Sequence, residues 1–309
     1  MKDKIKAIPR TEQVRDLEYS SGSPSELRAL TSLLSDNDKK IIGMVWENLV
    51  KLGAVSLPYL QEVSEHADPR VRLRARRICA EIRSDQLEKL YSLLAGMDDQ
   101  EFDIEFALAV VSMIEYPDLE LSDVTDRLDE LVEDVKAHLS DDLTPRARIE
   151  QLVKYLFETE GYKGNTRDYY NPDNSFIHKV IDRKMGIPIS LSALLILLGR
   201  RLNLELRGVG LPKHFVVKYE DEAGEEIFID PFNGGRIFNR EECMQMLTSD
   251  GYYFRESFAA EYLAVSTHRE IIIRMLRNLV LIYSKLRDKN RVKQLSRYVE
   301  ILRTRERAR

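Results

Sequence analysis

The fold is decided by residues 186–235, which carry three motifs in order: Gly186-Ile187-Pro188-Ile189-Ser190, then Gly208-Val209-Gly210-Leu211-Pro212-Lys213-His214-Phe215, then Phe228-Ile229-Asp230-Pro231-Phe232-Asn233-Gly234-Gly235. The first motif opens a run that is apolar on nearly every face as far as residue 202, which predicts a buried central helix. The other two motifs predict neighbouring strands, because the polar residues 221–224 between them include the glycine of a hairpin loop. The sequence therefore sets a hydroxyl at a helix start, an imidazole on one strand and a carboxylate on the next.

This order of side chains has a chemical meaning. A nucleophile at a helix N-terminus lies at the positive end of the helix dipole, which favours its anion. An imidazole within reach can take its proton, and a carboxylate behind the imidazole fixes the tautomer. Ser190, His214 and Asp230 are therefore the candidate triad. Each also has a purely structural reading, as a helix cap, a core histidine and a turn residue before proline.

The motifs carry a family resemblance. Residues 102–248 resemble the SirB-type bacterial branch of the transglutaminase-like superfamily, which places Cys, His and Asp in this order. The matching words include Glu115-Tyr116-Pro117-Asp118, Asn174-Ser175-Phe176, Gly208-Val209-Gly210 and Asp230-Pro231-Phe232-Asn233-Gly234-Gly235. The resemblance implies an α+β fold, mostly helical, whose central domain is transglutaminase-like and related to the papain-like cysteine proteases. It also implies that His214 is the base and Asp230 its orienting carboxylate.

One difference from that family concerns the nucleophile. At the position of the family's cysteine, this chain offers Ser190 or Ser192, and its two cysteines, Cys79 and Cys243, lie elsewhere in the sequence. A hydroxyl is a much weaker nucleophile than a thiol, which is partly ionised at neutral pH. The sequence therefore predicts triad-like geometry without predicting catalysis.

Composition narrows the classes of function. The net charge of −5 and the pI near 5.7 disfavour general attraction to nucleic acid or to a membrane surface. Two distant cysteines give neither a disulfide framework nor metal-site spacing, which indicates a reducing compartment. The first residues lack the apolar core of a signal peptide, and the longest apolar run, residues 187–198, is too short to span a bilayer. We expect a cytoplasmic protein without cofactor or bound metal.

Periodicity predicts helical segments on both sides of the central motifs. Residues 1–23 read as a flexible arm and residues 24–84 as two HEAT-like repeats, in which Asp38 falls on Asp68 and Val45 on Ala75 after a shift of 30 residues. Residues 85–250 form the expected transglutaminase-like domain. Residues 251–309 resemble a tetratricopeptide-like helical tail. Arginines at 70, 72, 74, 76 and 77 favour a solvated helix surface over a phosphate-binding face, because they spread over more than one side of the helix.

Two functions follow from these observations. The first is a regulatory or protein-interaction protein on a degenerate transglutaminase-like domain, which binds a protein partner through its helical repeats or its central cleft. The second is an enzyme, a hydrolase or acyltransferase of protease or transglutaminase-like type, with Ser190 as nucleophile, His214 as base and Asp230 as orienting group. A third, nucleic-acid binding, rests only on the arginine-rich helix and conflicts with the acidic balance.

Overall fold

The computed structural model describes residues 22–140, 143–249 and 262–304. The chain forms two compact units, one up to Leu90 and the other from Tyr91 onward. Most of the expected arm at 1–23 lies outside the described residues, as do the end of the chain from 305 and nearly all of an aromatic-rich stretch at 252–262. The domain limits drawn from the sequence stay predictions.

The first unit is a small helical layer. Its elements are α2 (Pro24–Ser32), η1 (Leu33–Ser35), α3 (Lys39–Leu52), η2 (Gly53–Ser56), α4 (Leu57–Val63) and α5 (Pro69–Gly96), the last of which continues beyond the unit. Equivalent positions of the two expected repeats share one core, which includes Val45, Leu49, Val71, Ala75 and Cys79. These residues therefore form one shared apolar core.

The two segments expected to be repeats also begin in the same way. Asp38 caps α3 by accepting from the backbone N–H of Lys40, and Asp68 caps α5 by accepting from that of Arg70. Several arginines of α5 bind the chain itself: Arg70 pairs with Asp68, and Arg74 donates to the backbone carbonyls of Leu34 and Asp36, between α2 and α3. These contacts hold the loops between helices.

One stretch among the described residues, Lys39–Val63, is long and apolar enough to cross a membrane by length and composition alone. It is not a single helix, because α3 ends at Leu52 and Gly53 takes a positive φ of 65°. The 3₁₀ turn η2 separates it from α4, and both helices contribute to the core of the first unit.

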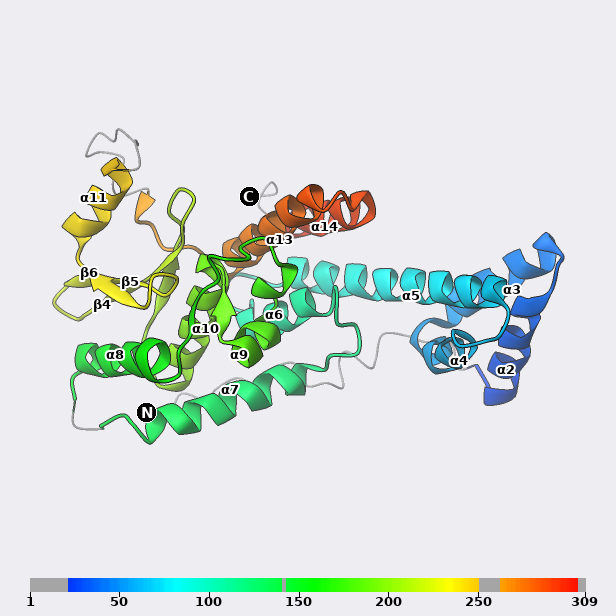
Figure 1. Cartoon of the computed structure of the whole chain (residues 1–309), viewed down its shortest axis with the longest axis horizontal. Coiled ribbons are helices and arrows are strands. Elements are labelled where there is room, and N and C mark those ends of the chain that lie inside the picture. The colour runs from blue at the N-terminus through cyan, green and yellow to red at the C-terminus, as the bar shows by residue number, and fades with distance from the viewer. Residues whose placement is uncertain (1–21, 141–142, 250–261, 305–309) are drawn as a thin grey trace. The chain divides into compact units, whose positions relative to one another are not determined.

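The second unit combines a small sheet with helices (Figure 1). Its helices are α6 (Ile104–Ser112), α7 (Leu121–Lys136), α8 (Pro145–Lys154), η3 (Tyr155–Thr159), η4 (Pro172–Asn174), α9 (Ile177–Arg183), α10 (Pro188–Arg201), α11 (Arg240–Ser249), α13 (His268–Lys285) and α14 (Lys289–Arg303). The expected α+β class, mostly helical, is confirmed.

The sheet has four antiparallel strands in the order β3 (Arg207–Val209), β4 (Val216–Glu220), β5 (Glu226–Asp230) and β6 (Arg236–Phe238). A separate parallel pair, β1 (Lys163–Gly164) and β2 (Met185–Gly186), precedes the central helix. The predicted hairpin joins β4 to β5: Gly224 has a φ of 83°, and the Asp221 carboxylate accepts from two backbone N–H groups of the loop.

Helix α10 is the centre of this unit, as its sequence predicts. Every residue from Pro188 to Gly199 is buried. The helix packs against β3 and β4 on one side and against α7, α9 and α13 on the others, as Figure 1 shows. A helix that is apolar all round is stable only in such a position.

Candidate functional site

Ser190 lies in the first turn of α10, where its hydroxyl is already bonded. Pro188 is the first helical residue and Ile187 the N-cap, so Ser190 is the third residue of the helix rather than the cap itself. Its Oγ donates to the backbone carbonyl of Asn174 at 2.6 Å and accepts from the backbone N–H of Ile187 at 3.0 Å. The side chain is fully buried. The hydroxyl thus ties the helix start to the loop before α9.

The approach to this helix is tight. A Cβ placed on Gly186 would lie 2.6 Å from the Ser190 hydroxyl oxygen, so only glycine fits there. Ser192, the other candidate at the cysteine position, is also buried and bonds the backbone carbonyl of Phe215 at 3.4 Å. That weak contact joins α10 to the start of β4.

Two buried asparagines organise the loop that covers the helix start. Asn165 donates its amide to the Asn174 side-chain oxygen at 3.0 Å, and Asn174 donates in turn to the backbone carbonyls of Asp168 and Tyr169. Asn165 also accepts from the backbone N–H of Asp168. Both amides therefore bond backbone groups of the loop and fix its conformation over the helix start.

The structure brings His214 and Asp230 together. His214 lies two residues before β4, Asp230 ends the adjacent β5, and His214 Nε2 is 2.8 Å from Asp230 Oδ2. Asp230 also accepts from the backbone N–H groups of Phe232 and Asn233 and from the Asn233 amide. Burial alone would raise the pKa of Asp230, but the hydrogen bonds from His214 and Asn233 outweigh it, and the pKa lies below its usual value.

This pairing assigns the nitrogens of the imidazole. An ionised carboxylate only accepts, so Nε2 of His214 donates to Asp230 Oδ2, and Nδ1 is the nitrogen left for another partner. Within the described residues Nδ1 has no hydrogen-bond partner, and Ser190 makes no hydrogen bond to the ring. The expected pair is therefore formed, whereas the hydroxyl is bonded elsewhere. A catalytic role for Ser190, His214 and Asp230 stays a prediction.

Neither cysteine supplies the missing nucleophile in the described structure. Cys79 belongs to the core of the first unit. Cys243 lies on α11, fully buried beside the sheet, and burial raises its pKa to about 12. A thiol with such a pKa is almost entirely protonated at neutral pH and is a poor nucleophile.

The sequence reading missed one residue of the site, Arg274 on α13. Its Nη2 donates to the backbone carbonyls of Leu211 and His214 at 2.7 and 2.6 Å, so it holds the turn that carries the histidine. Its guanidinium also lies over the Phe215 ring. The aromatic rings of Tyr169 and Phe232 complete the surroundings of His214. A single arginine in a helical stripe gives no sequence signal for such a contact.

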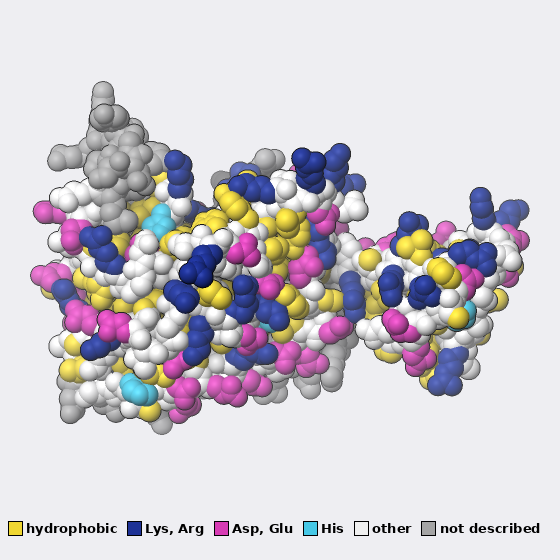
Figure 2. Space-filling model, viewed as in Figure 1, with side chains coloured by type: hydrophobic (Ala, Val, Ile, Leu, Met, Phe, Trp, Pro, Cys, Tyr) yellow, Lys and Arg dark blue, Asp and Glu magenta, His cyan; other side chains and the backbone are white. Residues whose placement is uncertain are grey.

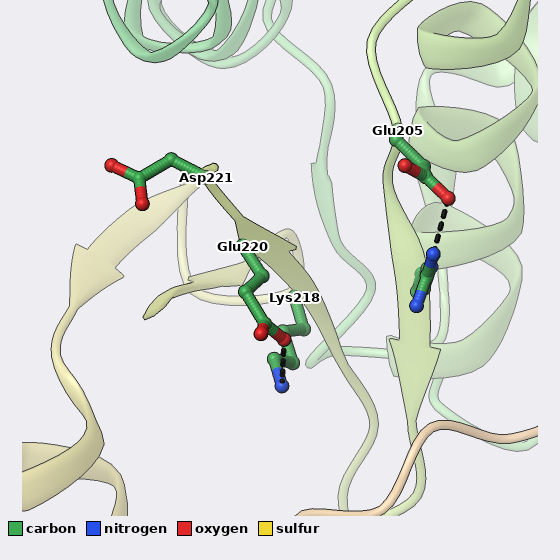
Figure 3. A pocket seen from close by; sticks show the side chains of 5 residues that line it. Glu205, Lys218, Glu220 and Asp221 are labelled. Atoms are coloured by element: carbon green, nitrogen blue, oxygen red, sulfur yellow. Dashed lines mark hydrogen bonds and ion pairs between the residues drawn. The ribbon is translucent and has the colours of Figure 1, made fainter. Parts of the chain in front are cut away.

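A cavity of about 200 Å³ opens elsewhere, beside β3 and β4, and Figure 3 shows the charged residues that line it. Glu205 pairs with Arg207, and Lys218 pairs with Glu220 and with Glu226. None of the triad candidates lines this cavity. Two of its three carboxylates pair with its two cations, and the third, Asp221, accepts from backbone N–H groups of the hairpin loop. Among the residues that the structure describes, no group of three or more His, Cys, Asp or Glu side chains is arranged to hold a metal ion.

A helix N-terminus packed on an antiparallel sheet is typical of a transglutaminase-like domain when a histidine pairs with an aspartate on the next strand. Here His214 lies in the turn before β4, rather than on the strand as expected, and pairs with Asp230 at the end of β5. The family described as "Transglutaminase-like superfamily" matches residues 122–277, half of the chain. The chain therefore belongs to this superfamily and, by its relatives, to the UPF0162 proteins within it.

The relatives fall into two groups. A UPF0162 protein of Xylella fastidiosa is 32% identical over 197 residues, which cover 63% of this chain and 70% of the relative. One from Vibrio cholerae is 31% identical over 46% of this chain and 53% of its own length. The human F-box only protein 21 is 26% identical over 63% of this chain but only 34% of its own length. No solved structure matches the chain.

Proposed function

We propose that this chain is a non-catalytic protein-interaction or regulatory protein, built on a degenerate transglutaminase-like domain. The bonding of Ser190 carries the proposal. A serine nucleophile needs a base within hydrogen-bond reach, whereas this hydroxyl donates to the Asn174 carbonyl and is fully buried. The His214–Asp230 pair then serves as a polar anchor of the cleft rather than as a base.

Exposed apolar side chains support a protein partner. In the first unit Met44 is 65% exposed and Leu73 52% exposed, on helices that we take to be HEAT-like. In the second unit the α13–α14 pair, which we take to be tetratricopeptide-like, exposes Leu281 and Leu286. Surfaces of stacked helices commonly bind other proteins. The related segment of F-box only protein 21 also forms part of a longer chain, which fits a module that works with other domains. We place the chain in the SirB-type branch and in the cytoplasm.

Active-site labelling of the wild type and of Ser190→Ala tests the absence of serine catalysis. We expect no adduct at Ser190 with a fluorophosphonate probe, because the hydroxyl is buried and bonded to backbone groups. Ser190→Ala should cost about 0.5–2 kcal/mol in the free energy of unfolding, the usual range for a lost capping contact at a helix start. Mass spectrometry and urea denaturation measure the two effects. Stoichiometric labelling that Ser190→Ala and His214→Ala both abolish would overturn the proposal.

The enzyme remains the second candidate because His214 and Asp230 lie 2.8 Å apart. In that function, His214 takes the Ser190 proton as the hydroxyl attacks an amide carbonyl. The C–N bond breaks, and the amine leaves with that proton. The acyl-serine then passes its acyl group to water or to another amine and regenerates the hydroxyl. A Ser190→Cys variant separates the two candidates. We expect its thiol to resist iodoacetamide at neutral pH, as a buried side chain should. Rapid alkylation with release of acyl products from peptide amides would instead show a site that lacks only its thiol. Cys243→Ala in the same chain removes the background.

A further inference from the structure

Arg274 is a cation without a counter-ion among the described residues. No carboxylate lies within ion-pair distance of it there, and both N–H groups of Nη2 are used by backbone carbonyls. Burial lowers the pKa of its guanidinium, and only Tyr169 acts in the opposite direction. A partly buried cation that lacks an anion is unfavourable, since the lost hydration is not replaced.

The guanidinium of Arg274 packs closely against Gly210. A Cβ placed on Gly210 would lie 2.7 Å from Nη1, so only glycine admits the guanidinium at this position. In the part of the chain that the structure describes, Nε and Nη1 of Arg274 have no hydrogen-bond partner, and they are not among the buried unpartnered atoms. These groups therefore remain available to an incoming acceptor.

A ring of contacts leads from Arg274 around His214 and back to α13. The His214 ring lies 6.3 Å from Phe232, Phe232 lies 6.0 Å from Tyr169, and Tyr169 lies 5.3 Å from Tyr170, measured between centroids. Lys285 Nζ lies 3.3 Å from the Tyr170 ring centroid and closes the ring. We call these six residues the mouth: Arg274, His214, Phe232, Tyr169, Tyr170 and Lys285.

One face of α13 borders the mouth. Arg274, Leu281 and Lys285 recur at spacings of seven and four residues, which places them on one side of the helix. Leu281 is 52% exposed and Tyr170 is 42% exposed. In Figure 2 hydrophobic side chains gather over the part of the surface that Figure 1 assigns to α13, with lysine and arginine side chains beside them. The surface combines two cations with apolar and aromatic area.

We propose that the mouth binds an acidic segment of a protein partner, with a carboxylate side chain on Arg274 and an apolar side chain against Tyr170 and Leu281. Charge complementarity selects this occupant, because the unpartnered N–H groups of Arg274 can donate a charge-assisted hydrogen bond to a carboxylate oxygen and Lys285 adds a second positive charge. The inference rests on the proposed function and specifies its partner. Beyond that function, it assigns the binding of the partner's carboxylate to Arg274 on α13.

The test is a charge cycle between peptide and protein. The probes are acetyl-Glu-Leu-Glu-Leu-amide and its uncharged twin acetyl-Gln-Leu-Gln-Leu-amide, titrated into the full-length chain and followed by NMR. We expect the acidic peptide to bind wild type about tenfold tighter than its twin, the scale of one charge-assisted hydrogen bond. The Arg274→Gln variant should lose most of this preference, because only the weaker attraction of Lys285 remains. Arg277→Gln, an exposed arginine one turn along α13, should behave as wild type.

Several outcomes would contradict the inference. An unchanged preference in Arg274→Gln would mean that the carboxylate lies elsewhere, and binding of neither peptide would remove the acidic partner. Equal binding of free glutamate would assign the mouth to small carboxylates instead. If Arg274→Gln fails to fold, the Arg274 Nε–H resonance of wild type still reports the contact, and its shift must saturate with the acidic peptide only. Fluorophosphonate labelling of Ser190 would refute the proposed function independently, whereas a failed charge cycle would leave that function standing.

Discussion

Arg201→Ala should lower the free energy of unfolding by about 3–5 kcal/mol, the cost of leaving a buried charge without its partner. Arg201 reaches from α10 to Glu105 on α6 with two hydrogen bonds, at 2.7 and 3.0 Å. The Glu105 side chain is only 8% exposed, and Thr125 is its one further hydrogen-bond donor among the described residues. Removing the guanidinium leaves this buried carboxylate without its cation.

The neighbouring arginine supplies the control. Arg200 pairs with Asp103 at 3.3 Å, but its side chain is 52% exposed, so Arg200→Ala should cost less than about 1 kcal/mol. Urea denaturation followed by circular dichroism measures both variants. The fluorescence of Trp46, the one tryptophan of the chain, follows the first unit separately. Similar losses for the two arginines would show that burial does not govern the Arg201 pair.

Between pH 7 and pH 5, the free energy of unfolding of His178→Leu should fall by about 2 kcal/mol less than that of the wild type. His178 is the second residue of α9, is 3% exposed and packs edge-on against Tyr116. Neither ring nitrogen has a hydrogen-bond partner in the described structure. Burial lowers its pKa to about 4, with Lys179 and Arg127 acting in the same direction and Asp182 and Asp173 opposing.

The direction of this pH dependence follows from the number of protons that the folded and unfolded chains bind. The unfolded chain has a histidine pKa near 6.5 and binds a proton at pH 5 that the folded chain excludes. The contribution of His178 to the free energy of unfolding should therefore be fully present above pH 6.5 and be lost as the pH drops toward 4. Leucine does not titrate, so the variant should lack this part of the pH dependence. Urea midpoints at several pH values measure it; parallel curves for the variant and wild type would contradict the prediction. His138→Leu, at an exposed histidine, is the control.

Sequence patterns were sufficient where one local rule governs the structure. The run from Pro188 is apolar on all faces, so its burial as α10 could be predicted from composition alone. The hairpin between β4 and β5 followed from Asp221 and Gly224, and the strand pairing then brought His214 to Asp230. The superfamily is confirmed by the family match, and the fold class is confirmed by the observed elements.

Contacts between distant segments could not be predicted. The carbonyl that takes the Ser190 hydroxyl belongs to Asn174, and which of several acceptors wins depends on how the loop closes over α10. The contact of Arg274 with the turn at His214 depends in the same way on the packing of α13 against α10. His178 resembles any other helical residue in the sequence, since its burial comes from Tyr116, far upstream.

The contribution of α13 also sets an order of events during synthesis. A ribosome releases His214 and Asp230 well before Arg274, which alone among the described side chains binds the His214 carbonyl. At a synthesis rate of roughly 5–20 residues per second, that helix is made several seconds after the strands. During this interval the turn at His214 lacks its clamp, and the α10 face that α13 will cover is open to water or to a chaperone.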